Sequence, residues 1–285
     1  KWRSLETYER ICIMASKVAA IDFREDFRKS EYRYDFALDA FAKGINKQLL
    51  PASQAVEKSI PLIARGMSAS SGLWIHNSQN NNLPFYYIDS GYFGNQKKKL
   101  WHRVTYNELQ NTKPIKQQNV ERLEIQMQAQ WKDIYNPITS GRKILICPPS
   151  KKVMSFFNQP GPEEWTSNII KQLTQLTDRP IQVRLKPSRT DRQTVNSIRH
   201  TLEDDVHCLI TYNSIAATEA LIAGKPAITL GPNAAQNICE TDIKNIENPK
   251  VPTKDEMFAF LTHLSYCQFT VSEMKEGIHW KYLTD

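Results

Sequence analysis

The segment TYNSIAATEALIAGKPAITLG, residues 211–231, carries the clearest indication of the fold. A polar pair, Asn213-Ser214, lies between the end of an apolar run, residues 206–212, and a helical stretch made almost entirely of apolar residues. Gly224 and a proline then stop the helix before a second apolar run begins. Strand, turn, helix and strand in this order are typical of an open parallel sheet, with the turn at the carboxyl end of the first strand.

The same alternation continues on both sides of this stretch. Apolar runs that end at prolines or polar residues alternate with helical stretches, one of which starts with Pro162 and two glutamates. We expect strands at residues 143–149, 180–188, 206–212 and 226–231, and helices at residues 161–178, 189–204, 215–223, 254–265 and 271–283. This order predicts a doubly wound parallel sheet in the second half of the chain.

The first half alternates in the same way but less regularly. We expect strands at residues 10–16, 59–66 and 84–89, with a short helix after the second. Residues 31–48 predict an amphipathic helix, because five apolar side chains fall on one face: Phe36, Ala37, Ala40, Phe41 and Ile45. The first half is therefore predicted to be a small open α/β domain.

A helix without Gly or Pro at residues 116–135, followed by the turn-rich NPITSGR, is the expected domain boundary. We predict a first α/β domain at 1–135, a second, Rossmann-like domain at 136–270, and a C-terminal helix at 271–285. Two such doubly wound domains would face each other across a cleft, where ligands of open parallel sheets bind.

The chain of 285 residues carries a net charge of +7, and the excess lies in its first half. Residues 1–135 hold 20 Lys and Arg against 14 Asp and Glu, while residues 136–285 hold 17 against 16. The charge is densest at 96–116, where aromatic residues are interleaved, as suits contact with a polyanion such as nucleic acid. The alternative is a solvated loop. The predicted acceptor-binding residues are Ser90, Tyr92, Lys97, Lys98, Lys99, Trp101 and Arg103.

No apolar stretch approaches the ~20 residues of a membrane span, and the first residues show no secretory signal pattern. The five cysteines are scattered, without the spacing of a zinc site, which indicates reduced thiols. We therefore expect a cytoplasmic protein with no metal and no resident cofactor.

Polar and cationic residues follow the four expected strands of the second half, which predicts a ligand that carries phosphate. The alternative at each position is a helix cap or a turn former. Glu219 lies in an otherwise apolar helix, five residues after Ser214, where a carboxylate can bind the two hydroxyls of a ribose. The predicted donor-binding residues are Ser150, Lys186, Ser188, Arg189, Tyr212, Asn213, Ser214, Glu219 and Gly231.

The segment NSIAATEALIAGKPAITLG resembles the donor-binding segment of glycosyltransferases with the GT-B fold. With IDSGYF (88–93) and RLKPS (184–188), it is most similar to the group related to capsular polysaccharide (Kdo-type) transferases. The resemblance covers most of 143–283 and, more loosely, 59–106. Two positions depart from the pattern: Ser188 stands where those enzymes have His, and Ser90 interrupts their acidic-Gly pair.

The resemblance implies a metal-independent transfer of a hexose or pentose from UDP-sugar or another nucleotide sugar. An inverting transfer needs a general base, for which we predict Asp89 first and His102 second. A retaining transfer would need no such base, and the sequence leaves both open.

Similar short chains occur in phages, where they attach sugars to hydroxymethylated pyrimidines in DNA. The basic and aromatic residues therefore favour hydroxymethylcytosine in double-stranded DNA as acceptor, which would place the protein in the host cytoplasm. The first alternative is a capsular or cell-surface polysaccharide transferase that acts on a lipid-linked or oligosaccharide acceptor. A sugar-nucleotide epimerase of the same fold and a non-catalytic nucleic-acid-binding protein are the others.

Overall fold

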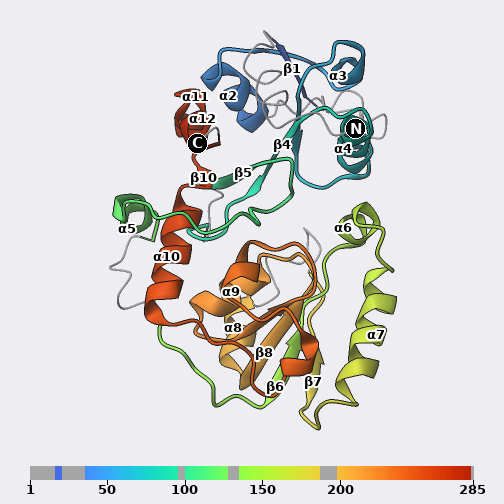
Figure 1. Cartoon of the computed structure of the whole chain (residues 1–285), viewed down its shortest axis with the longest axis vertical. Helices are drawn as coiled ribbons and strands as arrows, with labels where there is room; N and C mark the ends of the chain where they lie inside the picture. The colour runs from blue at the N-terminus through green and yellow to red at the C-terminus, as the bar shows by residue number, and fades with distance from the viewer. Residues whose placement is uncertain (1–16, 21–35, 96–99, 128–134, 187–197, 284–285) are drawn as a thin grey trace. The chain divides into compact units, whose positions relative to one another are not determined.

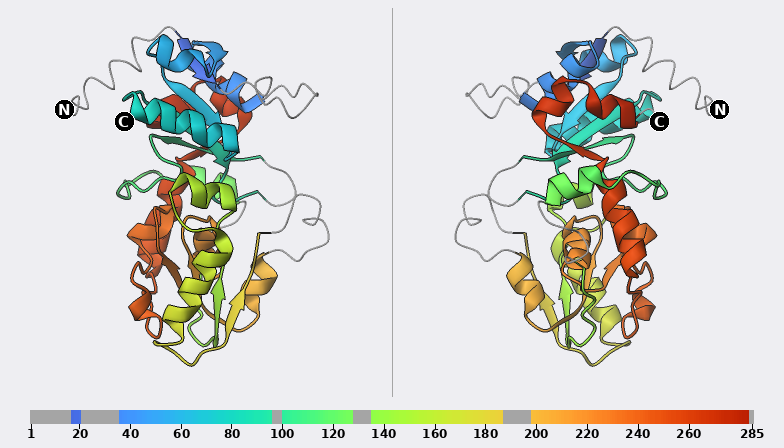
Figure 2. Two further views of the ribbon diagram at one scale, coloured as in Figure 1. Left: turned by 90° about the vertical axis from the view of Figure 1, so that its right-hand side faces the viewer. Right: turned by 90° about the vertical axis from the view of Figure 1, so that its left-hand side faces the viewer.

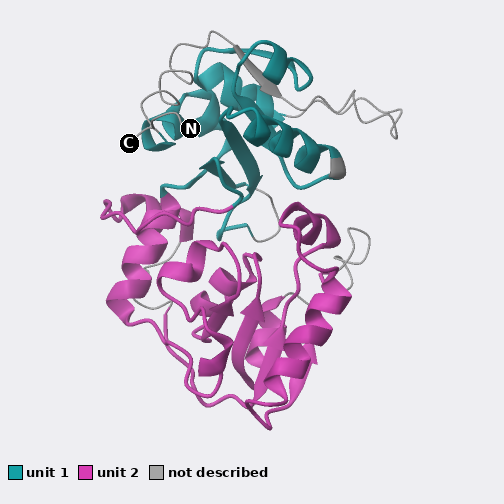
Figure 3. Cartoon of the chain, turned by 45° about the vertical axis from the view of Figure 1, so that its right-hand side comes forward, with its two compact units in different colours: residues 1–109, 266–285 teal, residues 110–265 magenta. Residues whose placement is uncertain are grey.

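The computed structural model describes residues 17–20, 36–95, 100–127, 135–186 and 198–283. The chain forms two compact units, one of residues 1–109 and 266–285 and one of residues 110–265 (Figure 3). The last residues of the chain thus belong to the first unit, and the boundary that we expected at 135/136 lies within the second. The strand expected at 10–16 lies outside the described residues.

The described strands of the first unit form one sheet. They are β1 (Lys17–Ala20), β2 (Gln48–Pro51), β3 (Leu62–Arg65), β4 (Phe85–Ser90), β5 (His102–Tyr106) and β10 (Gln268–Phe269). Their order is β10-β5-β4-β3-β1-β2, with parallel pairing from β2 to β4. β5 runs antiparallel to β4, and β10 runs antiparallel to β5. This antiparallel edge was not predicted from the sequence.

Helices cover both faces of this sheet (Figure 1). They are α2 (Phe36–Gly44), α3 (Gln54–Glu57), α4 (Ala69–Asn80), α11 (Val271–Lys275) and α12 (Ile278–Leu283). One face packs on α2, α11 and α12 through a cluster that includes Phe41, Tyr86 and Ile88. α4, cyan in Figure 2, contacts β3 and β4 and begins at Ser68, whose hydroxyl accepts the Ser71 N–H at 3.0 Å.

Two details of the first unit differ from the sequence-based expectation. The helix expected at 271–283 is divided into α11 and α12, because Gly277 takes a φ of +78° between them. Phe36, which we expected on the buried face of α2, is 67% exposed, whereas Ala37, Ala40 and Phe41 are buried as predicted.

The second unit is a four-stranded parallel sheet in the described residues, in the order β7-β6-β8-β9. The strands are β6 (Lys143–Ile146), β7 (Ile181–Val183), β8 (Val206–Thr211) and β9 (Ala227–Thr229). β8 and β9 are buried along their whole length, as expected for strands covered on both faces. This α/β fold with parallel strand pairing confirms the α/β part of the predicted fold class.

The helices of the second unit connect and cover these strands (Figure 1). They are α5 (Glu121–Met127), α6 (Lys151–Phe156), α7 (Pro162–Leu173), α8 (Ile198–Glu203), α9 (Ala216–Ile222), η4 (Ala234–Asn237), η5 (Ile243–Asn245) and α10 (Lys254–Ser265). α7 packs Trp165, Ile169 and Leu173 against the sheet. Gly224 follows α9 and its C-cap residue Ala223, with a φ of +75° and a position where a Cβ would lie 1.9 Å from the Asn136 carbonyl oxygen. None of the described helices is long and apolar enough to cross a membrane.

Candidate functional site

The order of strands in the second unit places a topological switch point between β6 and β8. In chain order, β6 is the first strand of this sheet. β7 pairs with one side of β6, and β8 then pairs with its other side. Thr211 at the end of β8 donates its hydroxyl to the Cys147 carbonyl at 2.6 Å, so the carboxyl ends of the two strands lie side by side. Ligands of open α/β sheets bind at the carboxyl ends of strands where the order reverses, which makes this edge the candidate site.

Glu219 is a partly buried carboxylate at this edge. Burial raises the pKa of Glu219 to about 7, and Arg184 and Lys186, which follow β7, act in the opposite direction. Burial also raises the pKa of the Cys147 thiol to about 12, with a lowering effect of Arg184 and a raising effect of Glu219. Glu219 on α9 therefore interacts electrostatically with residues that follow β6 and β7. The site therefore combines a carboxylate with two cations.

Ser214 and Asn213, which follow β8, have different surroundings. The Ser214 hydroxyl accepts the Ala216 N–H at 3.2 Å, although the N-cap position of α9 is Ile215, which has no side-chain cap. Asn213 is 7% exposed, and its amide donates to the Pro232 carbonyl. Asn213 thus bonds to the neighbouring turn, and its binding of the donor stays a prediction.

Tyr212 and Gly231 pack against each other. A Cβ on Gly231 would lie 2.5 Å from the nearest atom of the Tyr212 ring, so this position accepts glycine alone without rearrangement. The Tyr212 ring also meets Phe157, at 5.6 Å between ring centroids. Burial raises the pKa of Tyr212, so its hydroxyl stays protonated and available as a donor at neutral pH.

Of the four other predicted donor-binding residues, the structure describes two. Ser150 precedes α6 in an extended conformation, and its side chain makes no capping bond. Lys186 is exposed after β7. Ser188 and Arg189 lie outside the described residues.

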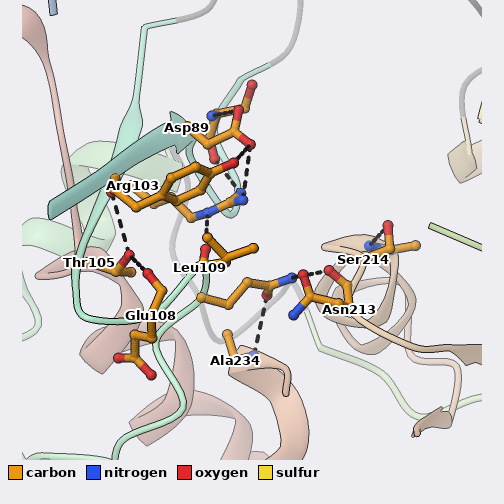
Figure 4. Close-up of polar contacts among 12 residues, drawn as sticks. Asp89, Arg103, Thr105, Glu108, Leu109, Asn213, Ser214 and Ala234 are labelled. Carbon is orange, nitrogen blue, oxygen red and sulfur yellow. Dashed lines mark hydrogen bonds and ion pairs between the residues drawn. The ribbon is translucent and has the colours of Figure 1, made fainter. Parts of the chain in front are cut away.

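In the first unit, Asp89 and Arg103 form a cross-strand ion pair between β4 and β5. Arg103 Nη2 lies 3.1 Å from Asp89 Oδ2, and its other nitrogens donate to the carbonyls of Ser90 at 2.9 Å and Leu109 at 3.1 Å (Figure 4). The Tyr87 hydroxyl donates to the same Asp89 oxygen at 3.0 Å. Burial, followed by the Asp89 charge, raises the pKa of Tyr87 well above 10, against the effect of Arg103. Asp89 is therefore held in place by charge and by hydrogen bonds.

Several residues predicted to form an exposed acceptor surface are buried. Tyr92, Trp101 and Arg103 are 1%, 7% and 6% exposed, and Arg103 lies with its guanidinium carbon 5.7 Å from the centres of two tyrosine rings. His102, the second candidate base, is 5% exposed on β5. Ser90 is partly buried, and its carbonyl accepts from Arg103. Lys97, Lys98 and Lys99 lie outside the described residues.

Three residues that shape these sites were not predicted from the sequence. Tyr87 lies two residues before Asp89, and the period of two along a strand was a usable signal that both side chains share one face. Arg184 lies within the predicted strand 180–188 and was taken as part of it. Gln110 had no signal, because it follows no periodic element.

The comparisons with known proteins give structural likeness only. No protein-family model matches the sequence, and no curated protein matches it. The fold is similar to a Thermosulfurimonas dismutans KpsC structure named as a beta Kdo 2,7 transferase, at 16% identity and a TM-score of 0.51, over 86% of this chain and 89% of that one. A second KpsC structure from the same organism, named as a beta Kdo 2,4 transferase, matches at 14% identity and a TM-score of 0.49, over 87% and 90%. At such identities the likeness establishes the fold.

Proposed function

We propose that this chain is a glycosyltransferase that takes its sugar from a nucleotide-sugar donor bound by the second unit. Glu219 is the observation that carries the proposal. It is a partly buried carboxylate with a pKa of about 7 at a topological switch point, and it lies within the electrostatic reach of Arg184 and Lys186. A carboxylate with this environment is typical of a binding site rather than of a stabilising surface.

The chemistry of a nucleotide sugar suits these groups. The ionised Glu219 accepts hydrogen bonds from the ribose hydroxyls, while Arg184 and Lys186 attract the phosphate oxygens. As the bond between the sugar and the nucleotide diphosphate breaks, negative charge grows on the departing diphosphate. Fixed cations stabilise that charge without a metal ion. The metal-independent transfer that we expected from the sequence is retained as part of the proposal.

The fold supports this assignment, because the solved structure with the higher TM-score is named as a sugar transferase. We extend the proposal to the two-domain GT-B arrangement, with the second unit as the donor domain. In the first unit, we propose Asp89 as the general base of an inverting transfer.

For the acceptor we prefer a cell-surface polysaccharide, in an oligosaccharide or lipid-linked form, over hydroxymethylcytosine in DNA. The DNA hypothesis used Trp101 and Arg103 as exposed contacts, and both are buried. The guanidinium of Arg103 is bound to Asp89 and to two backbone carbonyls instead of being presented to phosphates. The solved structure with the higher TM-score is named as a Kdo transferase, which favours the same choice.

The donor site is tested by nucleotide binding. We expect calorimetry with uridine, cytidine and guanosine nucleotides to detect binding of one of them to the wild type, and Glu219→Gln to weaken it by about tenfold or more. The matched control is Glu203→Gln, which changes an exposed glutamate on α8 of the same unit. Failure of the wild type to bind any of these nucleotides would refute the proposal.

The acceptor is tested by activity with the nucleotide sugars of the base that binds. One reaction contains hydroxymethylcytosine DNA and the other contains capsule-type oligosaccharides, and mass spectrometry detects the added sugar in each. We expect transfer to the oligosaccharide. Transfer to DNA alone, together with DNA binding that weakens steeply with salt, would reverse our choice of acceptor and leave the donor site intact.

A further inference from the structure

Two turns at the carboxyl edge of the second unit are joined by reciprocal side-chain bonds. We name them the β8–α9 turn (residues 212–215) and the β9–η4 turn (residues 230–233). The Asn213 amide of the first turn donates to the Pro232 carbonyl of the second. The Asn233 amide of the second donates to the Ser214 carbonyl of the first at 2.9 Å. Each turn therefore binds the backbone of the other.

A third carboxamide, Gln110, contacts both turns from a segment distant in sequence. Its Nε2 donates to the Asn213 carbonyl, and its Oε1 accepts the N–H of Ala234, the first residue of η4, at 3.3 Å (Figure 4). We name Gln110, Asn213 and Asn233 together the carboxamide clamp. Neighbouring bonds extend it, because Asn237 donates to the carbonyl of Lys113 at 2.8 Å.

The clamp is buried as well as fully engaged. Gln110 is 1% exposed and Asn233 is 0% exposed. Asn233 also accepts the Ala235 N–H at 3.0 Å and so caps η4. Buried amides whose donors and acceptors are all satisfied fix one arrangement, because any other would leave a polar group without a partner and without water. The two turns are consequently held in a single relative position.

These turns carry residues of the proposed donor site. Ser214 lies in the β8–α9 turn, and the Tyr212–Gly231 contact joins the two turns directly. A binding site benefits when its groups are held in the bound geometry before the ligand arrives, since less ordering is then needed on binding. None of the three clamp amides needs to contact the ligand for this effect.

We propose that Gln110, Asn213 and Asn233 are positioning residues that pre-organise the donor site by clamping the β8–α9 turn to the β9–η4 turn. The proposal rests on the proposed function, since it assumes that the donor binds at this edge. In this proposal Asn213 does not contact the donor directly. It holds in place the two turns that carry Ser214 and Gly231. It also adds Gln110, which precedes all the strands of the second unit.

The first test variant is Gln110→Glu. It keeps the oxygen that accepts the Ala234 N–H and replaces the donor to the Asn213 carbonyl by a second oxygen. The matched control is Gln126→Glu on α5, which removes an equivalent buried bond, from Gln126 Nε2 to the Ser265 carbonyl at 2.8 Å. We expect both variants to lower the melting temperature, and only Gln110→Glu to weaken binding of the nucleotide selected above, by about tenfold.

The second variant, Asn233→Ser, keeps a capping oxygen for η4 and loses the bond to the Ser214 carbonyl, so it tests the clamp even if Gln110→Glu fails to fold. We expect a higher KM for the nucleotide sugar and a kcat within about twofold of the wild type, because the clamp does not touch the reacting atoms. Unchanged nucleotide affinity in these variants, or an equal loss in Gln126→Glu, would overturn the clamp alone. A wild type that binds no nucleotide would overturn the proposed function together with it.

Discussion

Replacement of Glu219 by glutamine is expected to stabilise the protein and to impair it at the same time. The pKa of Glu219 is about 7 in the folded protein because of burial, against an ordinary value of 4.5. Between these two values the folded protein binds more protons than the unfolded chain. The free energy of unfolding therefore falls as pH rises through this window, and the destabilisation is complete above the folded pKa.

The size of this effect follows from the two pKa values. The difference between 4.5 and about 7 corresponds to roughly 3 kcal/mol of unfolding free energy lost when Glu219 ionises. Glutamine has nearly the same shape and never ionises. We therefore expect Glu219→Gln to be up to about 3 kcal/mol more stable than the wild type near pH 8, with the gap closing near pH 4.5.

Urea unfolding followed by tryptophan fluorescence, at several pH values between about 4.5 and 8, measures this gap. Nucleotide affinity, measured on the same samples, is expected to fall in the variant that gains stability. Glu203→Gln, which changes an exposed glutamate on α8 of the same unit, is the control for both measurements. If Glu219→Gln were less stable than the wild type at every pH, Glu219 would be a structural partner of Arg184 and Lys186, and our reasoning would be refuted.

Three further changes test other parts of the structure. Gly231→Ala places a Cβ 2.5 Å from the Tyr212 ring and is expected to cost about 1–3 kcal/mol of stability, read as a lower melting temperature. Arg103→Met leaves Asp89 without its cation and should cost about 2 kcal/mol in urea unfolding, below the value for a fully buried pair because Asp89 is 35% exposed. Burial lowers the pKa of His279 from 6.5 to about 4, so the free energy of unfolding decreases as pH falls through this window. His279→Leu should reduce this decrease in the free energy of unfolding by roughly 3 kcal/mol.

Each of these substitutions has a control substitution, either in the same unit or at a residue of the same amino-acid type. Gly161→Ala should leave the melting temperature nearly unchanged, because the nearest atom to its Cβ is 3.6 Å away at the end of a glutamate side chain. Lys43→Met removes an exposed pair with Asp39 and should have little effect. His200→Leu, which changes a histidine whose side chain is 65% exposed, is the control for His279→Leu. Equal effects in a variant and its control would contradict the corresponding explanation.

The parallel sheet of the second unit was predictable because its signals are local. The run expected at 206–212 became β8 (Val206–Thr211), and the helix expected at 254–265 became α10 with the same bounds. Continuous apolar runs and helical periodicity depend on neighbouring residues alone. β10 is a different case, since two residues near the end of the chain pair with β5, far away in sequence. No local pattern encodes such a pairing.

The candidate site was predictable only in part, for the same reason. Glu219 attracted attention because a carboxylate is out of place in an apolar helix, and that signal needs no tertiary structure. The role of Gln110 depends on contacts 103 residues away with Asn213, in a segment of no regular pattern. Asn213 had a sequence signal, but the signal did not specify its role. An amide that follows a strand has the same sequence signature whether it binds a ligand or a neighbouring turn.

Arg103 shows why a count of charges could not choose the acceptor. The basic stretch at 96–116 suggested a surface for DNA, yet the charge of Arg103 is directed at Asp89 on the adjacent strand. A buried cation that is paired in this way contributes little to the field outside the protein, because the partner carboxylate cancels it at short range. The same pair gives Asp89 a fixed position, with Tyr87 as a second donor. In the sequence, Arg103 indicated a binding surface for a polyanion, whereas in the structure it orients the carboxylate of Asp89. Our hypothesis for the acceptor therefore rests on the chemistry of Asp89 rather than on the attraction of an anionic polymer by positive charge.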